Sequence, residues 1–417
     1  MRILWTLPYL PWPTTSGART RQFHLLRSMS RRGHQITLLV HSRCPLTEAA
    51  RQALEPWLER LIVVRRRPLK SPLTLLALLN PTYPTLASIN GLAPCLRHAF
   101  ERLLEEDWDV IQIEHSYSFQ PFERALQASR RPFLLIEHNI ESAKGISAER
   151  LPFWLTPFTT FDRWRYRHWE ARVFAQASEV VAVTRRDAEF FSEITDRHTH
   201  VVVNGVDCAH YQEICPALRS QRLLFVGNFE YGPNLDAIEW ALEEILPHVW
   251  MSNPAVRFAI CGHALPPGWK LRWSDPRIEW QSFCPDLRDL QGHSAIFFAP
   301  LRHGGGSRLK VLEAMAAGLP VVTTSQGVSG LDVENGIHYL GSDDAADLAL
   351  YITQALAQPL RLKQLSDAAR DFVRREHDWS VAANQLESVY ARLLNNTRNA
   401  SATDSSDSSD AYEGSAE

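Results

Sequence analysis

One strand–turn–helix–strand unit restricts the fold of this chain more than any other segment. Two short apolar runs, residues 296–301 and 320–324, flank the stretch His-Gly-Gly-Gly-Ser-Arg-Leu-Lys-Val-Leu-Glu-Ala-Met-Ala-Ala-Gly-Leu. Runs of this length, bounded by glycine and proline, predict buried strands. The stretch between them predicts a helix that Ser307 caps and that Gly318 ends. Two strands joined through a helix favour a doubly wound α/β domain with a parallel sheet.

The glycine turn before this helix predicts a phosphate site. Bare backbone amides beside the positive end of a helix bind anions, and Arg308 and Lys310 add two cations in the first turn. Glu313 lies seven residues after Gly306, which on a helix is roughly 9–10 Å. That distance separates a pyrophosphate from its ribose, so the predicted ligand is a nucleoside diphosphate. The residues of this predicted donor site are Gly304, Gly305, Gly306, Ser307, Arg308, Lys310 and Glu313.

A glycine turn does not by itself identify a ligand. Such turns precede helices in many α/β proteins that bind no ligand, and the two cations and Glu313 argue against that case. The chain contains no Gly-Lys pair, which excludes a Walker phosphate loop. Leu309 occupies the place of the third glycine of the dinucleotide fingerprint.

The bulk composition indicates a two-domain protein without nucleic-acid partners. The chain has 417 residues, too long for one core, and a net charge of −3. Its six cysteines show no paired metal-ligand spacing. The single Asp-x-Asp, at Asp107 and Asp109, precedes a predicted strand instead of following one, so metal independence is expected. No stretch of about 20 uninterrupted apolar residues exists, and the cytoplasm is the expected location.

Short apolar runs alternate with helical patterns along both halves of the chain, as in two tandem Rossmann-like domains. In the first half, strands are predicted at 2–6, 35–41, 60–64, 110–114, 133–137, 179–184 and 200–203. In the second half, they are predicted at 222–229, 255–261, 277–281, 295–300 and 320–324. The predicted organisation is a domain over 1–207, a linker over 208–220, a domain over 221–378, a C-terminal helix over 379–395 and a disordered tail over 396–417.

The donor segment resembles that of glycosyltransferase family 4, the retaining enzymes of group 1 with the GT-B fold. The matching residues are Glu313-Ala314-Met315-Ala316, Gly318-Leu319-Pro320-Val321-Val322 and Asn204-Gly205-Val206-Asp207. The family commonly carries another glutamate eight positions before Glu313, where this chain has Gly305. This departure puts recognition of the donor sugar by a side chain at that position in doubt. Neutralisation of the diphosphate charge is then expected from Arg308 and Lys310.

The resemblance implies two Rossmann-like domains that face a central cleft, and a helix that returns to the first domain. It also implies transfer of a sugar from a nucleotide-diphosphate sugar with retention of configuration. The helix N-terminus and the two cations would stabilise the leaving diphosphate without a metal or a cofactor. A sugar-nucleotide epimerase of the same fold, or a non-catalytic relative, remains an alternative.

Residues of the first half complete the predicted site. Gly17 lies in the first strand-to-helix turn, where an ordinary turn glycine is the alternative, and similarity to the family's glycine loop favours donor binding. His138 matches the position of a functional histidine in the family, although isolated histidines are often structural. His115 and Arg19 are assigned to the acceptor side, with a structural histidine and a solvated helix face as alternatives.

The first turn of the second half contains Gly227 and Asn228, both assigned to donor binding. Many family members carry an Arg and a Lys in this loop to hold the diphosphate. Here no cation occurs between Gly227 and Trp240. The phosphate charge therefore falls more heavily on Arg308 and Lys310.

The acceptor is the part of the site that the sequence defines least. A glycan, a lipid-linked oligosaccharide or a small molecule fits, as in polysaccharide biosynthesis. The basic and apolar stretch 65–83 and the aromatic stretch 154–174 contain features of a membrane interface. The alternative for the second stretch is a helix packed on its own sheet. Peripheral contact with the inner face of the membrane is thus a second expectation for the location.

Overall fold

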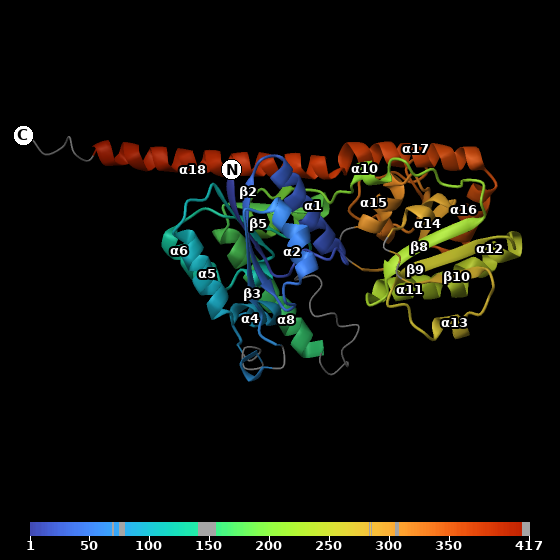
Figure 1. The fold of residues 1–417 in the computed structure, drawn as a ribbon, viewed down its shortest axis with the longest axis horizontal. Coiled ribbons are helices and arrows are strands. Elements are labelled where there is room, and N and C mark those ends of the chain that lie inside the picture. The colour runs from blue at the N-terminus through green and yellow to red at the C-terminus, as the bar shows by residue number, and fades with distance from the viewer. Residues whose placement is uncertain are drawn as a thin grey trace, which may run out of the picture. The chain divides into compact units, whose positions relative to one another are not determined.

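The computed structural model describes residues 1–68, 71–74, 80–140, 156–282, 284, 286–304 and 308–410. It consists of two compact units (Figure 1). Unit 1 contains Met1–Val203 and Ala383–Glu417, and unit 2 contains Asn204–Ala382. Each unit is built on one parallel β-sheet with helices on its faces, which confirms the predicted α/β class.

Unit 1 has a seven-stranded sheet in the order β3-β2-β1-β4-β5-β6-β7. Every pairing in it is parallel. The central strands read as continuous apolar runs because helices cover both faces of such a sheet. The strands are β1 (Arg2–Leu7), β2 (Gln35–Ser42), β3 (Arg60–Arg65), β4 (Val110–Glu114), β5 (Leu134–Ile136), β6 (Glu179–Ala182) and β7 (His200–Val201). All seven predicted strands exist, and their ends lie within two residues of the predicted ones.

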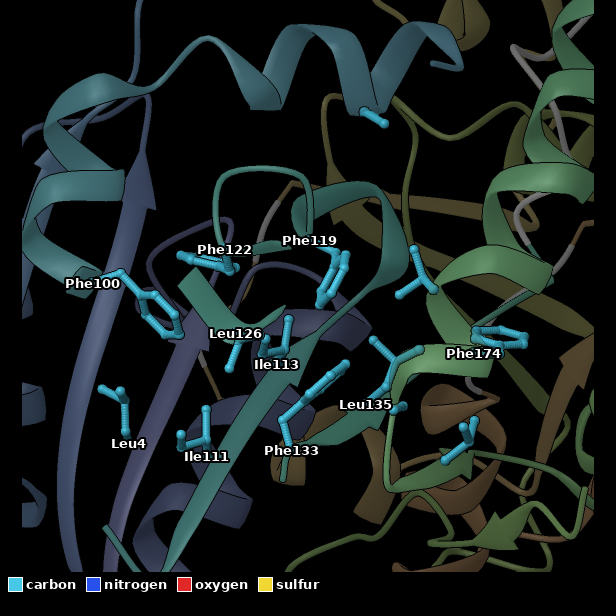
Figure 2. Packing of buried hydrophobic residues seen from close by; sticks show 14 of the residues in the cluster. Leu4, Phe100, Ile111, Ile113, Phe119, Phe122, Leu126, Phe133, Leu135 and Phe174 are labelled. Carbon is cyan, nitrogen blue, oxygen red and sulfur yellow. The ribbon is translucent and has the colours of Figure 1, made fainter. Parts of the chain in front are cut away.

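An aromatic core holds the helices of unit 1 on this sheet. Figure 2 shows Phe119, Phe122 and Phe133 beside strand residues such as Ile111 and Ile113. Truncating one such phenylalanine costs about 3–5 kcal/mol of stability. The helices of the unit are α1 (Gly17–Arg31), α2 (Glu48–Leu54), η1 (Glu55–Trp57), α4 (Thr85–Gly91), α5 (Pro94–Leu104), η2 (Ser116–Ser118), α6 (Glu123–Ser129), α8 (Thr156–Gln176) and α9 (Arg185–Thr195).

Unit 2 has a six-stranded sheet in the order β10-β9-β8-β11-β12-β13, again all parallel. Its strands are β8 (Arg222–Asn228), β9 (Arg257–His263), β10 (Ile278–Gln281), β11 (Ile296–Ala299), β12 (Val321–Thr323) and β13 (Leu340–Gly341). The sequence did not indicate β13, because Leu340 and Gly341 do not belong to an apolar run like the one that predicted the equally short β7. The helices are α10 (Cys208–Tyr211), α11 (Gly232–Trp240), η5 (Ala241–Ile245), α12 (Leu246–Ser252), α13 (Trp269–Arg272), α14 (Arg288–Gly292), α15 (Leu309–Ala316), η6 (Gln326–Val328), α16 (Ala345–Leu356) and α17 (Pro359–Glu376).

Helix α15 begins later than the sequence predicts. Its N-cap residue is Arg308, whose side chain makes no capping hydrogen bond, so the prediction that Ser307 occupies the cap position is wrong. The end of α15 is as predicted. Gly318 adopts φ +72°, and the amide of Leu319 donates to the carbonyl of Ala314 at 2.9 Å, as in a Schellman motif.

The last helix, α18, covers Trp379–Asp410. From Ala383 onward it belongs to unit 1, where Glu387 accepts from Arg32 at 2.6 Å and lies 2.8 Å from His34. We expected disorder from residue 396, but the described helix continues to Asp410, and the Asn396 side chain donates to Glu179 at 2.8 Å. Residues 411–417 lie outside the described residues. Within the described chain, no helix combines the length and the apolar character that crossing a membrane requires.

Candidate functional site

The turn between β11 and α15 is built around Gly304. Its φ of +106° lies in a region that side chains rarely adopt. An added Cβ would approach the Tyr231 hydroxyl to 2.7 Å and Pro233 Cγ to 2.9 Å. The Gly304 carbonyl accepts hydrogen bonds from Arg308 at 2.9 Å and from the Gln326 amide at 2.6 Å. Two side chains, from the start of α15 and from η6, therefore hold the start of the turn in place. Gly305, Gly306 and Ser307 lie outside the described residues.

Arg308 is a buried cation whose charge no described carboxylate neutralises. The side chain is 8% exposed, and burial lowers its pKa below the ordinary value. Its Nε is buried without a hydrogen-bond partner among the described residues, and none of their carboxylates forms an ion pair with it. A desolvated guanidinium of this kind is a strong binder for an anion.

Lys310 lies beside Arg308 in the same desolvated region. Its Nζ donates to Asn234 Oδ1 at 2.6 Å and lies 4.4 Å from the centre of the Phe225 ring. Burial, together with the neighbouring Arg308, lowers the pKa of Lys310 to about 7. Among the residues that the structure describes, no carboxylate comes within ion-pair distance of Nζ. Two desolvated cations at the start of one helix are an arrangement that can bind an anion.

Glu313 lies one turn after Lys310 on α15. Burial raises the pKa of Glu313 to about 7, against a smaller opposing effect of Lys310. Burial, with a smaller contribution from Glu313, raises the pKa of the Tyr211 hydroxyl in α10. No hydrogen bond links the Glu313 carboxylate to another described side chain. The carboxylate can therefore accept hydrogen bonds from hydroxyl groups of a ligand.

The turn after β8 joins this cluster. The Asn234 side chain donates to the Asn228 carbonyl at 2.7 Å while its oxygen accepts from Lys310. A Cβ on Gly227 would lie 3.0 Å from Asn234 Nδ2, so this position requires a small residue. Asn228 Oδ1 accepts the Glu230 amide at 3.0 Å and orders the turn. The structure thus brings Gly227, Asn228 and Lys310 together around Asn234, which was not among the predicted site residues.

Another nearby cation is already paired. Arg302 follows β11, and its guanidinium lies 2.5 Å from Asp236 and 5.0 Å from the centre of the Trp240 ring. This pairing raises the pKa of Arg302. Arg302 therefore has a carboxylate partner within its own unit, whereas Arg308 has none among the described residues.

In unit 1, His138 follows β5 and Glu114 ends β4. The Nε2 of His138 lies 2.8 Å from Glu114 Oε2 and 2.9 Å from the amide nitrogen of Gln22 in α1. His138 is 7% exposed and Glu114 is fully buried. Burial raises the pKa of the Glu114 carboxyl above its ordinary value.

The polar contacts continue behind Glu114. Gln112 donates to Glu114 Oε1 at 2.6 Å, and the Tyr390 hydroxyl of α18 donates to Gln112 Oε1 at 2.5 Å. These residues are buried, which makes each hydrogen bond costly to lose. Glu114, Gln112 and Gln22 were not among the predicted site residues. The carboxylate at the end of a buried strand is the sequence signal that could have identified Glu114.

His115 lies next to His138, with ring centres 4.3 Å apart. Its φ of +65° is unusual for a residue with a side chain. The Nε2 atom lies 3.3 Å from the Tyr9 hydroxyl, and Nδ1 lies 3.8 Å from Glu137 Oε2. Backbone strain of this kind is concentrated at functional sites.

Gly17 and Arg19 lie in the first turn of α1. Ser16 is the N-cap residue and makes no side-chain capping bond, and the Arg19 guanidinium donates to Thr15 at 3.2 Å. Because Gln22 of the same helix contacts His138, this turn belongs to the same end of the unit 1 sheet as His138.

Comparisons with known proteins agree with the predicted fold. A "Glycosyl transferase 4-like domain" model matches residues 16–205, and a "Glycosyl transferases group 1" model matches residues 220–358. An "Uncharacterized 44.6 kDa protein in cps region" of Klebsiella pneumoniae is 20% identical over 379 residues, covering 88% of this chain and 94% of that protein.

Solved structures are similar over most of the chain. Anabaena HepE in complex with UDP and glucose has a TM-score of 0.66 at 18% identity, covering 94% of this chain and 100% of that chain. Sucrose-phosphate synthase from Thermosynechococcus elongatus has a TM-score of 0.69 at 16% identity, covering 94% and 99%. At these identities the likeness shows the fold alone, and it confirms the predicted GT-B fold.

Proposed function

The chain belongs to the group 1 glycosyltransferases of family 4, and we propose that it transfers a sugar from a nucleotide-diphosphate sugar to a hydroxyl acceptor. In this proposal, transfer retains the anomeric configuration and uses no metal or cofactor. The acceptor is a glycan, a lipid-linked saccharide or a small molecule. The structure of HepE with UDP and glucose supports a uridine nucleotide as the first donor to examine.

The observation that carries the proposal is the pair of cations at the start of α15. Arg308 and Lys310 are desolvated and lie beside each other, and no described carboxylate lies within ion-pair distance of either cation. Cleavage of the bond between the anomeric carbon and phosphate leaves negative charge on the departing diphosphate. Preorganised cations in a dry site stabilise that charge without reorganisation, which is the largest single contribution in many enzymes.

Glu313 completes the donor site in this proposal. Its carboxylate has no described hydrogen-bond partner and lies one helical turn beyond Lys310. We assign it to the two ribose hydroxyls of the nucleotide. Gly304, Gly227 and Asn228 shape the backbone around the diphosphate, and the close approaches at the two glycines support that role.

In unit 1 the proposal assigns His138 to contacts with hydroxyl groups of the sugar or the acceptor. Gly17 is assigned to donor binding. The contact with Glu114 fixes the imidazole and supplies a partner for its proton. His115 and Arg19 are assigned to the acceptor side. The short distance between the two imidazole rings supports a shared role for His115 and His138.

The test is to incubate the purified full-length protein with nucleotide sugars, with and without candidate acceptors. A transferase releases nucleoside diphosphate in proportion to glycosylated product, and NMR of the product reports the anomeric configuration. Isomerised donor without an acceptor would instead show an epimerase. Failure of the protein to bind any nucleoside diphosphate would leave only a non-catalytic relative.

A further inference from the structure

Helix α8 carries an exposed aromatic surface. Phe158, Phe161 and Trp164 are 41%, 46% and 55% exposed. The rings of Phe161 and Trp164 stack at 5.8 Å with an angle of 16° between their planes. Three large aromatic side chains three residues apart form one continuous apolar strip, not isolated exposed residues.

Positive charge flanks the same strip. Arg163 and Arg167 are exposed, and neither forms an ion pair with a carboxylate in the described parts of the chain. The two acidic residues of α8, Asp162 and Glu170, are both fully buried. An aromatic strip flanked by arginines suits the boundary between lipid headgroups and acyl chains.

Specific contacts hold the aromatic strip outward. Asp162 accepts from the amide and the hydroxyl of Thr85, both at 2.9 Å. Arg165 donates to the carbonyl of Asn80 at 2.8 Å and lies 2.5 Å from Asp162. Because these buried contacts fix the rotation of the helix, Phe161 and Trp164 cannot turn into the core without breaking a buried ion pair.

The aromatic stretch that the sequence singled out therefore divides in two. Tyr166, Trp169 and Phe174 are buried, and Trp169 donates to the carbonyl of Ser116 at 2.9 Å. These three residues satisfy the alternative of a helix packed on its own sheet. Phe158, Phe161 and Trp164 are not part of this buried packing, and each is more than 40% exposed.

We propose that Phe158, Phe161, Arg163, Trp164 and Arg167 form a docking surface for a bilayer with anionic headgroups. The aromatic rings lie at the headgroup level, and the two guanidinium groups bind lipid phosphates. Contact between two copies through this surface would place like charges against each other, which disfavours self-association. The proposal does not depend on the donor site.

The experiment is sedimentation of the full-length protein with vesicles of phosphatidylcholine alone, or with one quarter phosphatidylglycerol. We expect binding to the anionic vesicles that weakens as NaCl rises, and little binding to the neutral ones. The double variant Arg163→Gln/Arg167→Gln should lose about 25-fold in partitioning, since each arginine contributes about fivefold at an anionic surface. The double variant Phe161→Ser/Trp164→Ser should lose at least about tenfold.

The matched control removes exposed leucines of similar size elsewhere. Leu271 and Leu360 are 86% and 84% exposed in unit 2, and Leu271→Ser/Leu360→Ser should bind vesicles like the wild type. Equal binding of the wild type to neutral and anionic vesicles would overturn the proposal. So would unchanged binding in the α8 variants, or a dimer by light scattering that these variants abolish. Thermal unfolding and nucleotide binding should be unchanged in all of them, which separates this result from a failure of the donor site.

Discussion

The Glu114 carboxylate lies 2.8 Å from Nε2 of His138, and both groups are buried at the carboxyl ends of adjacent strands. Behind Glu114 the contacts pass through Gln112 to the Tyr390 hydroxyl on the C-terminal helix. A histidine whose ring nitrogen contacts both a carboxylate and an amide side chain has a fixed ring orientation. His138 is therefore positioned for chemistry in a way that a solvent-exposed histidine is not.

Substitution of Glu114 tests whether this contact serves the reaction. Glu114→Gln keeps the size of the side chain and removes the carboxylate that contacts His138. We expect kcat to fall about 10–100-fold with little change in the KM for the donor, since general acid–base contributions are about 10²–10⁴-fold. In a His138→Ala background the same substitution should have almost no further effect, which steady-state kinetics of the double variant would establish.

The same sheet offers a matched control for this carboxylate. Glu179 lies 2.8 Å from Nε2 of His200 at the edge of the unit 1 sheet, away from the candidate site. Glu179→Gln should leave kcat unchanged. Equal losses in the two glutamine variants would show that the Glu114 effect is structural.

Removal of the two desolvated cations should abolish most turnover. We expect Arg308→Ala and Lys310→Ala each to reduce kcat by about 10²-fold or more while the protein remains folded, because each removes a preorganised donor to the leaving group. Arg302→Ala is the control, since Arg302 is already paired with Asp236. Its kcat should stay within about threefold of the wild type. Near-normal turnover of the Lys310→Ala variant would show that Lys310 does not stabilise the leaving diphosphate.

Binding of the donor should be accompanied by uptake of a proton from the buffer at pH 8 and by release of a proton at pH 6. Lys310 has a pKa of about 7 and is mostly neutral at pH 8, so a bound diphosphate that favours its charged form takes up a proton. Glu313 also has a pKa of about 7 and is mostly protonated at pH 6, so ribose binding to its ionised form releases a proton. Donor affinity should therefore be highest near pH 7.

Calorimetry in buffers of different ionisation enthalpy measures this exchange. The ligand should be a nucleotide sugar, whose diphosphate does not titrate in this range. Lys310→Met should eliminate the uptake at pH 8, and Glu313→Gln should eliminate the release at pH 6. Proton exchange that is unchanged in both variants would place the titrating groups elsewhere.

Gly304→Ala should destabilise unit 2 and weaken donor binding. The φ of +106° and the close approach to the Tyr231 hydroxyl predict a cost of about 1–3 kcal/mol. Differential scanning calorimetry should show a lower unfolding temperature. Gly268→Ala is the matched control, because Gly268 has φ −72° and an added Cβ meets nothing within 4 Å. An equal effect of the two substitutions would contradict the assigned strain.

Most strands and their parallel arrangement could be predicted, because both sheets are buried on two faces and each central strand is therefore a short apolar run. The first residue of α15 could not be predicted, because Ser307 and Arg308 are adjacent and the local preference for a capping residue favours serine. Glu114 was missed because a single sequence does not show which strand neighbours His138. The exposure of Trp164 was also not predictable, since it depends on the buried pair Asp162 and Arg165.

The most direct test of the central claim is calorimetric titration of the full-length protein with nucleoside diphosphates and their sugar conjugates. The account predicts saturable binding of at least one of them, reduced at least about tenfold by Arg308→Ala or Lys310→Ala and unchanged by Arg302→Ala. Absence of binding by every nucleoside diphosphate, or equal binding by all four proteins, would contradict the assignment of the start of α15 as the donor site.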